Sequence, residues 1–144
     1  MNTFKPVLTE YIDQEDCHTL QFYKSIGGYT ALEKVLTMNP DDVTQEVKDS
    51  NLRGRGGAGF SAGMKWGFIP KESNKPKYLI NNADESEPGT FKDRLLMNKA
   101  PHQMLEGMII AAYAIGCNTS FIYIRGEFYQ EYKLLEQTIA EAYD

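Results

Sequence analysis

The chain reads Gly54-Arg55-Gly56-Gly57-Ala58-Gly59-Phe60-Ser61-Ala62-Gly63, and this run holds five of its twelve glycines. Glycine lets the backbone approach a ligand closely and leaves N–H groups free to point at a phosphate. A second dense motif follows, Asn81-Asn82-Ala83-Asp84-Glu85-Ser86-Glu87-Pro88-Gly89, whose carboxylates suit sugar hydroxyls and ring N–H donors. Together the two motifs predict a region that holds a nucleotide.

The glycine run also fits the pattern G-x-G-x-x-G. This pattern marks a dinucleotide-binding Rossmann turn only when it follows a buried strand and opens a helix. Here the preceding residues 41–50 are mostly polar, and Val43 and Val47 have the spacing of a short surface helix. The first strand signal, residues 77–81, comes after the run. This order excludes the ordinary Rossmann fingerprint and leaves the phosphate-loop interpretation.

Length, charge and cysteine content narrow the class of protein. At 144 residues with a formal charge of −5, the chain fits one domain and is a poor candidate for non-specific nucleic-acid binding. Cys17 and Cys117 form no C-x-x-C pair, which predicts plain thiols in a reducing compartment. No secretory leader is recognisable, and the longest apolar run, residues 108–115, is far shorter than a bilayer span. We therefore expect a soluble protein on the cytoplasmic side.

The first third of the chain holds an arm and two short helix signals. Residues 1–28 are expected to be an irregular arm whose recurring aromatic side chains pack on another part of the protein. A capping-box spacing at Thr30 predicts a short helix that ends near Met38. A second short helix is predicted with Asn39 as its cap and Pro40 at its first position.

The second half of the chain alternates strand and helix signals. Residues 78–81 and 120–125 have the composition of strands. Residues 101–114 are apolar almost all round, which predicts a buried helix ended by Gly116, and residues 128–139 are amphipathic. This order predicts an α/β fold in which the glycine-rich loop is followed by a parallel β-α-β-α unit with a right-handed crossover.

Several motifs together resemble one family. The sequence closely resembles the flavin-bearing subunit of respiratory complex I, and related diaphorase subunits of NAD-linked hydrogenases and formate dehydrogenases share the signature. The resemblance is carried by residues 52–60, 63–66 and 82–94, and by Pro101-His102, Glu106-Gly107-Met108 and Arg125-Gly126-Glu127. It implies that residues 29–144, which follow the N-terminal arm of residues 1–28, are the first part of an incomplete Rossmann-like flavin- and NADH-binding domain of the complex I type.

The resemblance also implies cofactors and residue roles. The family binds FMN noncovalently and accepts a hydride from NADH onto it, so the protein supplies position and no catalytic acid, base or metal ligand is expected. The FMN phosphate, ribityl chain and flavin would be held by Gly54, Gly56, Lys65, Asn82, Asp84 and Glu85. The NADH side would be lined by Gly57, Ala58, Phe60, Phe68 and Glu87, with the aromatic rings stacked on adenine. Arg55 and Gly59 complete the cofactor-binding set.

The family passes its electrons through iron–sulfur clusters to quinone. A 4Fe-4S cluster is expected in the family, but its cysteine ligands are absent from this chain, which resembles the first third of such a protein. The implied partners are NADH and the other subunits of a respiratory or diaphorase complex, among them a thioredoxin-like 2Fe-2S protein. Neither nucleic acid nor direct membrane insertion is expected. The complex would lie on the cytoplasmic side, peripheral to the inner membrane.

Structural roles are an alternative interpretation for several of these residues, and a different function is an alternative for the whole chain. Two alternatives stay open for the whole chain: a non-catalytic fragment that serves only in assembly, and the diaphorase of a hydrogenase or formate dehydrogenase. Taken singly, Phe60, Phe68 and Trp66 have the character of core aromatics. A salt bridge or a helix cap suits Asp93 and Arg94 better than ligand contact, and His102, which follows a proline at a helix start, is expected to be structural.

Overall fold

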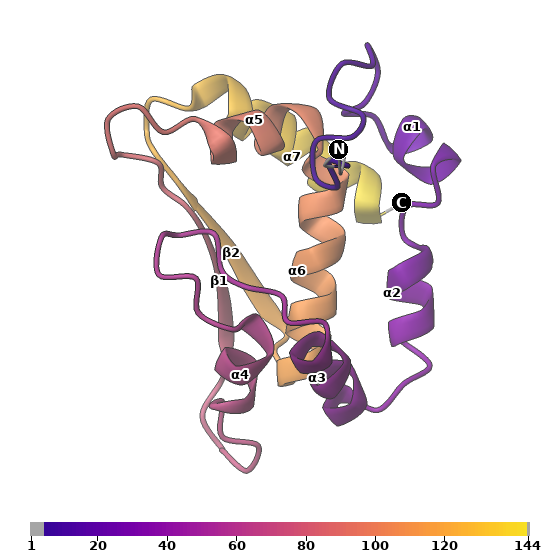
Figure 1. Ribbon diagram of the computed structural model, residues 1–144, viewed down its shortest axis with the longest axis vertical. Helices are drawn as coiled ribbons and strands as arrows, with labels where there is room; N and C mark the ends of the chain where they lie inside the picture. The colour runs from indigo at the N-terminus through magenta and orange to yellow at the C-terminus, as the bar shows by residue number, and fades with distance from the viewer. Residues whose placement is uncertain (1–4, 144) are drawn as a thin grey trace. The chain divides into compact units, whose positions relative to one another are not determined.

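The computed structural model describes residues 5–143, and Figure 1 labels the elements in this part of the chain. In chain order they are α1 (Leu20–Ser25), α2 (Thr30–Val35), α3 (Pro40–Asp49), α4 (Ala62–Gly67), β1 (Tyr78–Ala83), α5 (Lys92–Lys99), α6 (Pro101–Ile115), β2 (Thr119–Ile124) and α7 (Tyr129–Tyr143).

The chain divides into two compact units. The first unit contains described residues 5–29, 81–106 and 122–143, and the second contains residues 30–80 and 107–121. The unit boundaries fall within β1, α6 and β2, so each of these elements contributes residues to both units.

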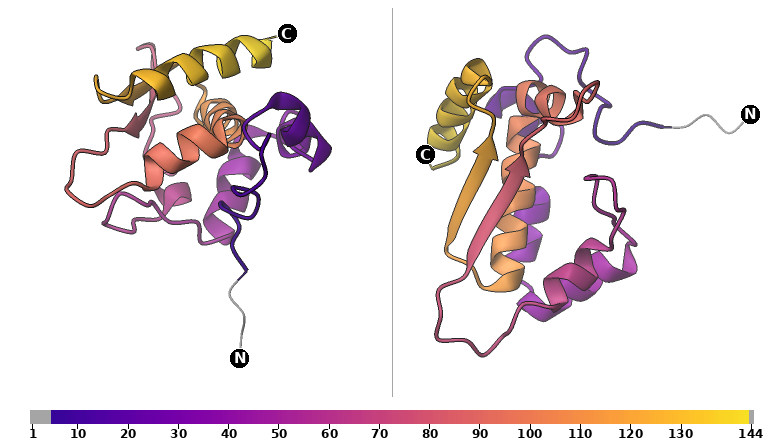
Figure 2. Two further views of the ribbon diagram at one scale, coloured as in Figure 1. Left: turned by 90° about the horizontal axis from the view of Figure 1, so that it is seen from above. Right: turned by 90° about the vertical axis from the view of Figure 1, so that its left-hand side faces the viewer.

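The two strands are hydrogen-bonded neighbours and run parallel, as the arrows in Figure 2 show. Parallel strands need a crossover connection, and here the chain between them contains α5 and α6. The predicted α/β class and the parallel pair are therefore confirmed. The right hand of the crossover stays a prediction. In the part of the chain that the structure describes, no helix is long and apolar enough to cross a membrane.

The core of the first unit forms where β1, α5 and α7 meet. Ala83, Met97 and Leu135 are buried together, and the side chains packed against them are Met104, Ile122, Ile124 and Phe128. The carboxylate of Glu131 on α7 is buried too, and it accepts hydrogen bonds from Arg94 Nε and Asn98 Nδ2 of α5, both at 2.8 Å. Burial alone would raise the pKa of Glu131, but these donors outweigh it and hold the pKa below its usual value.

The core of the second unit joins α2, α3 and the C-terminal part of α6. Val35, Val43 and Ala114 are buried there, and the half-buried side chains around them are Met38, Trp66, Ile110 and Tyr113. Trp66 thus has the core role that its residue type suggests. Tyr113 Oη also donates a 2.7 Å hydrogen bond to the carbonyl of Met38, which fastens the end of the α2 segment to α6.

Several element ends follow the sequence prediction. α3 begins at Pro40 after Asn39, although Asn39 makes no side-chain cap bond to the backbone. α6 begins at Pro101 and ends before Gly116, whose φ of +65° is a left-handed value that glycine adopts freely. The prediction of a buried helix at residues 101–114 is only partly right, because Ile109 on α6 remains exposed. The N-terminal arm is also less irregular than expected, since it contains α1.

Candidate functional site

The glycine-rich loop, residues 54–63, belongs to the second unit and is closed at its base. Gly54 N–H donates to the carbonyl of Phe60 at 2.8 Å, Arg53 pairs with Ser61 as an antiparallel bridge, and the Arg53 guanidinium donates to the carbonyl of Gly59 at 3.2 Å. Beyond this base the chain from Arg55 to Ala58 is exposed. Among the described residues, none pairs with the backbone N–H groups of this tip.

The glycines of the loop serve different purposes. Gly57 and Gly59 have φ values of +105° and +61°, which L side chains rarely adopt, so they allow the tip to turn. Gly56 has an ordinary φ, and a Cβ there would meet no atom within 4 Å. Gly63 lies at the start of α4, where a Cβ would approach Lys48 N on α3 to 2.5 Å. The open space around Gly56 is the feature expected of backbone that receives a ligand.

Three further predicted residues lie in the same unit as the loop. Lys65 stands on α4 with its side chain exposed. Phe60 and Phe68 flank α4 and are 47% and 67% exposed, with ring centroids 6.0 Å apart. An exposed pair of aromatic rings is not the core role that their residue type alone suggests. The structure therefore brings Phe60 and Phe68 together as a surface platform.

The acidic turn, residues 81–89, belongs to the first unit and is organised by its own side chains. Asn82 Oδ1 accepts a 3.1 Å hydrogen bond from Asp84 N–H, which closes an Asx-type turn. Ser86 Oγ lies 3.0 and 2.9 Å from the two oxygens of Asp84 and donates to that carboxylate. The predicted ligands Asn82 and Asp84 are thus fixed relative to each other by local hydrogen bonds.

The two glutamates of the turn differ in the burial and the hydrogen bonding of their carboxylates. Glu85 is only 4% exposed, and its carboxylate accepts from the backbone N–H groups of Asp93 at 2.9 Å and Arg94 at 3.1 Å. These N–H groups begin α5, whose own preceding residue, Phe91, makes no side-chain cap bond. Glu87 is exposed, and among residues 5–143 it is engaged only through its backbone carbonyl, which accepts hydrogen bonds from Thr90. Glu85 is therefore a helix cap in this structure, whereas the Glu87 carboxylate faces solvent.

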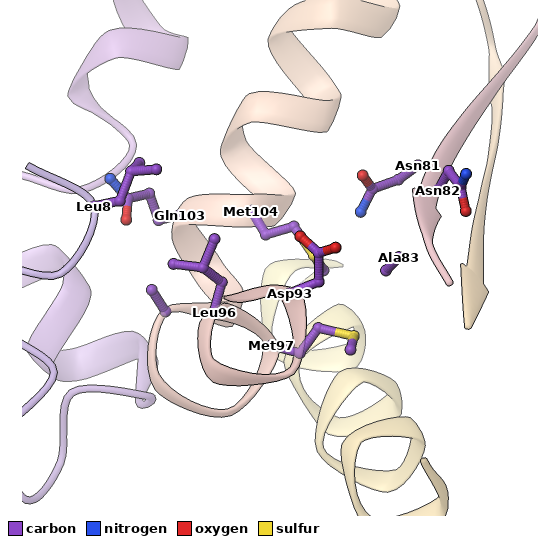
Figure 3. Close-up of a pocket in the computed structure, with 10 residues that line it drawn as sticks. Leu8, Asn81, Asn82, Ala83, Asp93, Leu96, Met97, Gln103 and Met104 are labelled. Atoms are coloured by element: carbon purple, nitrogen blue, oxygen red, sulfur yellow. The ribbon is translucent and has the colours of Figure 1, made fainter. Parts of the chain in front are cut away.

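A cavity of about 180 Å³ adjoins the acidic turn within the first unit. Figure 3 shows Asn81, Asn82 and Ala83 from β1 on one side and Leu8 and Gln103 on the other. The remaining lining side chains are Asp93, Leu96, Met97, Ala100 and Met104. Asn82 is the predicted site residue among them. Sequence reasoning misses Leu8 and Gln103, because neither lies in a motif and only the folded chain brings them beside β1.

The plainer interpretations hold for several neighbours of the motifs. Arg94 forms the ion pair with Glu131, and Asp93 pairs with Lys92, so the salt-bridge interpretation of both is confirmed. His102 is buried and hydrogen-bonded within the protein, as expected of a structural histidine. Cys17 and Cys117 are both buried free thiols. Among the described residues, no group of three or more His, Cys, Asp or Glu is placed to hold a metal ion.

Known proteins resemble this chain over most of its length. The family described as the Nuo51 FMN-binding domain matches residues 47–144. An NADH-quinone oxidoreductase component of Rhizobium meliloti is 55% identical over 142 residues, which cover 98% of this chain and 34% of that protein. Its counterpart in Streptomyces coelicolor is 51% identical over 138 residues, which cover 96% and 31%. The chain thus spans about one third of the length of these curated relatives.

A solved structure gives a further likeness. The crystal structure of an NAD+-reducing NiFe-hydrogenase in the air-oxidized state contains a chain that matches this fold with a TM-score of 0.69 at 39% sequence identity. The match covers 92% of this chain and 22% of that one. At this identity the likeness extends beyond the fold to the sequence itself.

Proposed function

This chain belongs to the Nuo51 FMN-binding domain family, and on that premise we propose that it binds FMN and NADH as part of an NADH dehydrogenase. The observation that carries the proposal is the exposed tip of the glycine-rich loop, Arg55 to Ala58, whose N–H groups are unpaired among the described residues and which offers open space at Gly56. When bound, FMN supplies the capacity to accept a hydride; the protein supplies binding and orientation.

The loop fits the phosphate of FMN. A phosphate dianion is held by several N–H groups with a cation nearby, and the tip combines free backbone N–H groups with the exposed cations Arg55 and Lys65. Gly54 and Gly56 would lie against the phosphate and the ribityl chain. No step of this binding requires an acid, a base or a metal.

The acidic turn fits the hydroxyls and ring nitrogens of the cofactor. Asn82 and Asp84 present oriented amide and carboxylate groups. We propose that the Asn82 amide donates hydrogen bonds to the ribityl chain and the flavin, and that the Asp84 carboxylate accepts hydrogen bonds from them. Glu85 remains in the proposed set, although its carboxylate already holds α5 and has only its remaining lone pairs to offer. Glu85 would therefore bind the cofactor while it also caps α5.

The aromatic platform fits the adenine of NADH. Phe60 and Phe68 present exposed rings, which is the feature that base stacking needs. Gly57 and Ala58 would present little side-chain bulk on the NADH side, and the exposed Glu87 carboxylate would accept hydrogen bonds from a ribose. Hydride transfer then depends on holding the nicotinamide face-on to the flavin.

The loop assignment is tested by flavin titration of the purified chain. Added FMN should lose its fluorescence on binding, and Gly56→Val should weaken binding about tenfold or more, the equivalent of one charge-assisted hydrogen bond. The substitution should leave the fold intact, because a Cβ at Gly56 meets nothing within 4 Å. Equal FMN affinity in the variant would show that the loop does not bind FMN. If the unmodified chain takes up no FMN, the assembly-fragment interpretation is favoured.

A separate prediction concerns the aromatic platform. Phe68→Ala should raise the KM for NADH by about ten- to a hundredfold in the complex that contains this chain, since stacking on a base contributes roughly 1–3 kcal/mol. Flavin content should not change. Phe91→Ala is a matched control, because Phe91 is 70% exposed but lies outside the proposed site. Loss of flavin with an unchanged KM for NADH would show that Phe68 lies beside FMN rather than beside NADH.

The wider setting is also a proposal. The relatives are named as components of NADH-quinone oxidoreductase, which supports work beside partner subunits. We propose that these include a thioredoxin-like 2Fe-2S protein and that the complex lies on the cytoplasmic face of the inner membrane. A diaphorase in an NAD+-reducing hydrogenase is the second candidate, favoured by the 39% identity to that enzyme. The proteins that co-purify with the chain distinguish the two, because they determine the final electron acceptor.

A further inference from the structure

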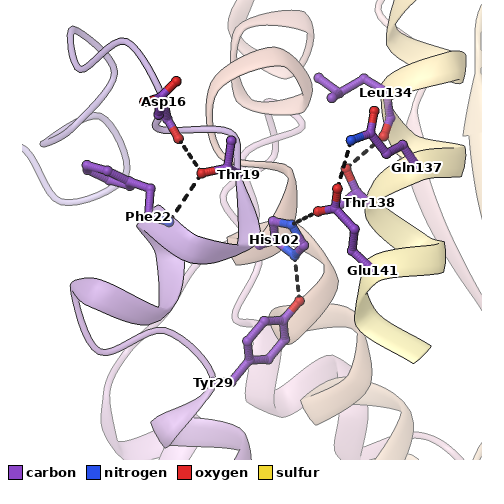
Figure 4. A network of polar contacts seen from close by, with 9 residues as sticks. All are labelled: Asp16, Thr19, Phe22, Tyr29, His102, Leu134, Gln137, Thr138 and Glu141. Carbon is purple, nitrogen blue, oxygen red and sulfur yellow. Dashed lines mark hydrogen bonds and ion pairs between the residues drawn. The ribbon is translucent and has the colours of Figure 1, made fainter. Parts of the chain in front are cut away.

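A buried histidine joins three segments of the first unit. His102, at the second position of α6, is 1% exposed. Its Nδ1 lies 2.8 Å from the Tyr29 hydroxyl, and its Nε2 lies 3.1 Å from Glu141 Oε2 on α7. Figure 4 shows the imidazole standing between these two partners. The N-terminal segment, α6 and α7 are thus joined through one ring.

A second set of contacts holds the same segment. The Tyr23 hydroxyl donates to Glu106 Oε2 on α6, and Tyr29 N–H donates to the same oxygen at 3.1 Å. The Tyr23 ring packs edge-on against Tyr29 at 5.2 Å between centroids and stacks on His102 at 6.1 Å. Polar and aromatic contacts therefore converge on the end of the N-terminal segment, residues 5–29.

The backbone at this point is strained. Tyr29 has a φ of +67°, an uncommon value for a bulky residue, and Gly27 has a φ of +89°. Gly28 lies so close to the Tyr23 ring that a Cβ would come within 2.3 Å of it. Strained backbone of this kind persists only where surrounding contacts determine it. Here those contacts include the two hydrogen bonds of Tyr29, so their loss would favour opening of the turn.

The two hydrogen-bond partners of His102 determine which ring nitrogen carries the hydrogen. The ionised Glu141 carboxylate can only accept, so Nε2 carries the hydrogen and Nδ1 accepts from the Tyr29 hydroxyl. Burial lowers the pKa of His102, and Lys24 and His18 lower it further, while Glu141 opposes them. Burial and the nearby Glu106 and Glu141 raise the pKa of Tyr29, and burial and Glu106 raise that of Tyr23, so both hydroxyls stay protonated. A second proton on His102 would occupy Nδ1 and leave the Tyr29 hydroxyl without its acceptor.

We propose that His102 is an acid-sensitive latch: neutral His102 holds the N-terminal segment against α6 and α7, and its protonation releases that segment. Release would also withdraw Leu8 from the wall of the cavity in Figure 3. The proposal does not depend on the cofactor assignment, because it concerns the chain without ligand.

The direction of the effect follows from proton linkage. The closed state has a lowered His102 pKa, and the open state has the ordinary value near 6.5. The open state therefore binds more protons below about pH 6.5, and the opening constant rises as the pH falls. One proton gives at most a tenfold rise per pH unit, which levels off below the closed-state pKa. Above about pH 7.5 the opening constant should be flat.

Native-state hydrogen exchange tests the latch. The amides of Tyr23, Gly28 and Tyr29 are hydrogen-bonded in the closed state and report its opening. After division by the intrinsic exchange rate, their opening constants should rise severalfold, up to about tenfold per unit, from about pH 6.5 to about 5.5. His102→Gln cannot titrate and should abolish this rise. His18→Gln, which changes the other histidine of the chain, is the matched control; it should retain the rise, only slightly reduced, because His18 contributes to lowering the pKa of His102.

Two results would overturn the proposal. The first is an opening constant that does not change with pH in the unmodified chain, or that changes equally in His102→Gln. The second needs no variant: an NMR titration in which the His102 ring protonates with a midpoint at or above about 6.5 while the segment stays closed. Should His102→Gln fail to fold, that titration decides the question alone.

Discussion

Alanine at Gly63 is expected to destabilise the second unit by about 2 kcal/mol, whereas alanine at Gly56 should leave its stability unchanged or slightly raised. A Cβ at Gly63 would lie 2.5 Å from Lys48 N and 2.7 Å from Lys48 Cα, which are backbone atoms of α3 that cannot rotate away. Overpacking of this kind costs roughly 1–3 kcal/mol. Replacing a helical glycine by alanine stabilises a helix by up to about 1 kcal/mol, which is less than the expected steric cost, so the net effect should be destabilising.

Urea unfolding followed by fluorescence measures this difference. Trp66 is the single tryptophan of the chain and packs against the buried Val35, Val43 and Ala114, so its emission reports the core of the second unit. Gly56→Ala is the control, since its Cβ would have open space and its φ is ordinary. A midpoint for Gly63→Ala equal to that of Gly56→Ala would mean that α3 and α4 do not approach as closely as the structure shows.

This pair of glycines illustrates what a sequence motif can and cannot reveal. The clustering of glycines in residues 54–63 is sufficient to predict a loop suited to a phosphate. It cannot show that Gly63 packs against α3, because that contact joins residues from two helices. Gly57 and Gly59 differ from Gly56 in φ, which no spacing within the motif records.

The predictability of the fold follows the length and periodicity of its elements. β1, β2, α6 and α7 are predictable because each carries a clear apolar pattern, and α6 and α7 have 15 residues each. α1 and α4 have only six residues each, and α4 contains two glycines, so neither displays a helical period. α5 escapes prediction for another reason: its cap is Glu85, which lies well before the helix, whereas local rules look for a cap at Phe91.

In the candidate site too, the sequence identifies residues but does not show the environment of each side chain. The family resemblance assigns Asp84 and Glu85 to the flavin and Glu87 to NADH, but it treats all three as ligands, and their spacing gives no indication that one of them is buried. The fold separates them by burial: Glu85 faces the start of α5, while Glu87 faces solvent. Environment rather than residue type therefore decides how much of each carboxylate is free for a ligand.

Glu85→Gln is expected to lower the free energy of unfolding of the first unit by about 1–3 kcal/mol, the usual cost of leaving a buried donor without its acceptor. A glutamine amide offers one oxygen where the carboxylate offers two, so the N–H of either Asp93 or Arg94 loses its partner. The amide group would also place N–H donors against the N–H donors at the start of α5. Chemical unfolding followed by far-ultraviolet circular dichroism provides the measurement.

Glu87→Gln is the matched change on the same turn, and its expected result is the opposite. Its side chain is exposed, so stability should change by less than about 0.5 kcal/mol. If Glu87 lies beside the ribose of NADH, as proposed, its charge repels the 2′-phosphate of NADPH, and the variant should show a smaller preference for NADH over NADPH. An unchanged coenzyme preference would return Glu87 to a turn residue. Equal loss of stability in both variants would contradict the difference between the buried, capping Glu85 carboxylate and the exposed Glu87 carboxylate that the structure shows.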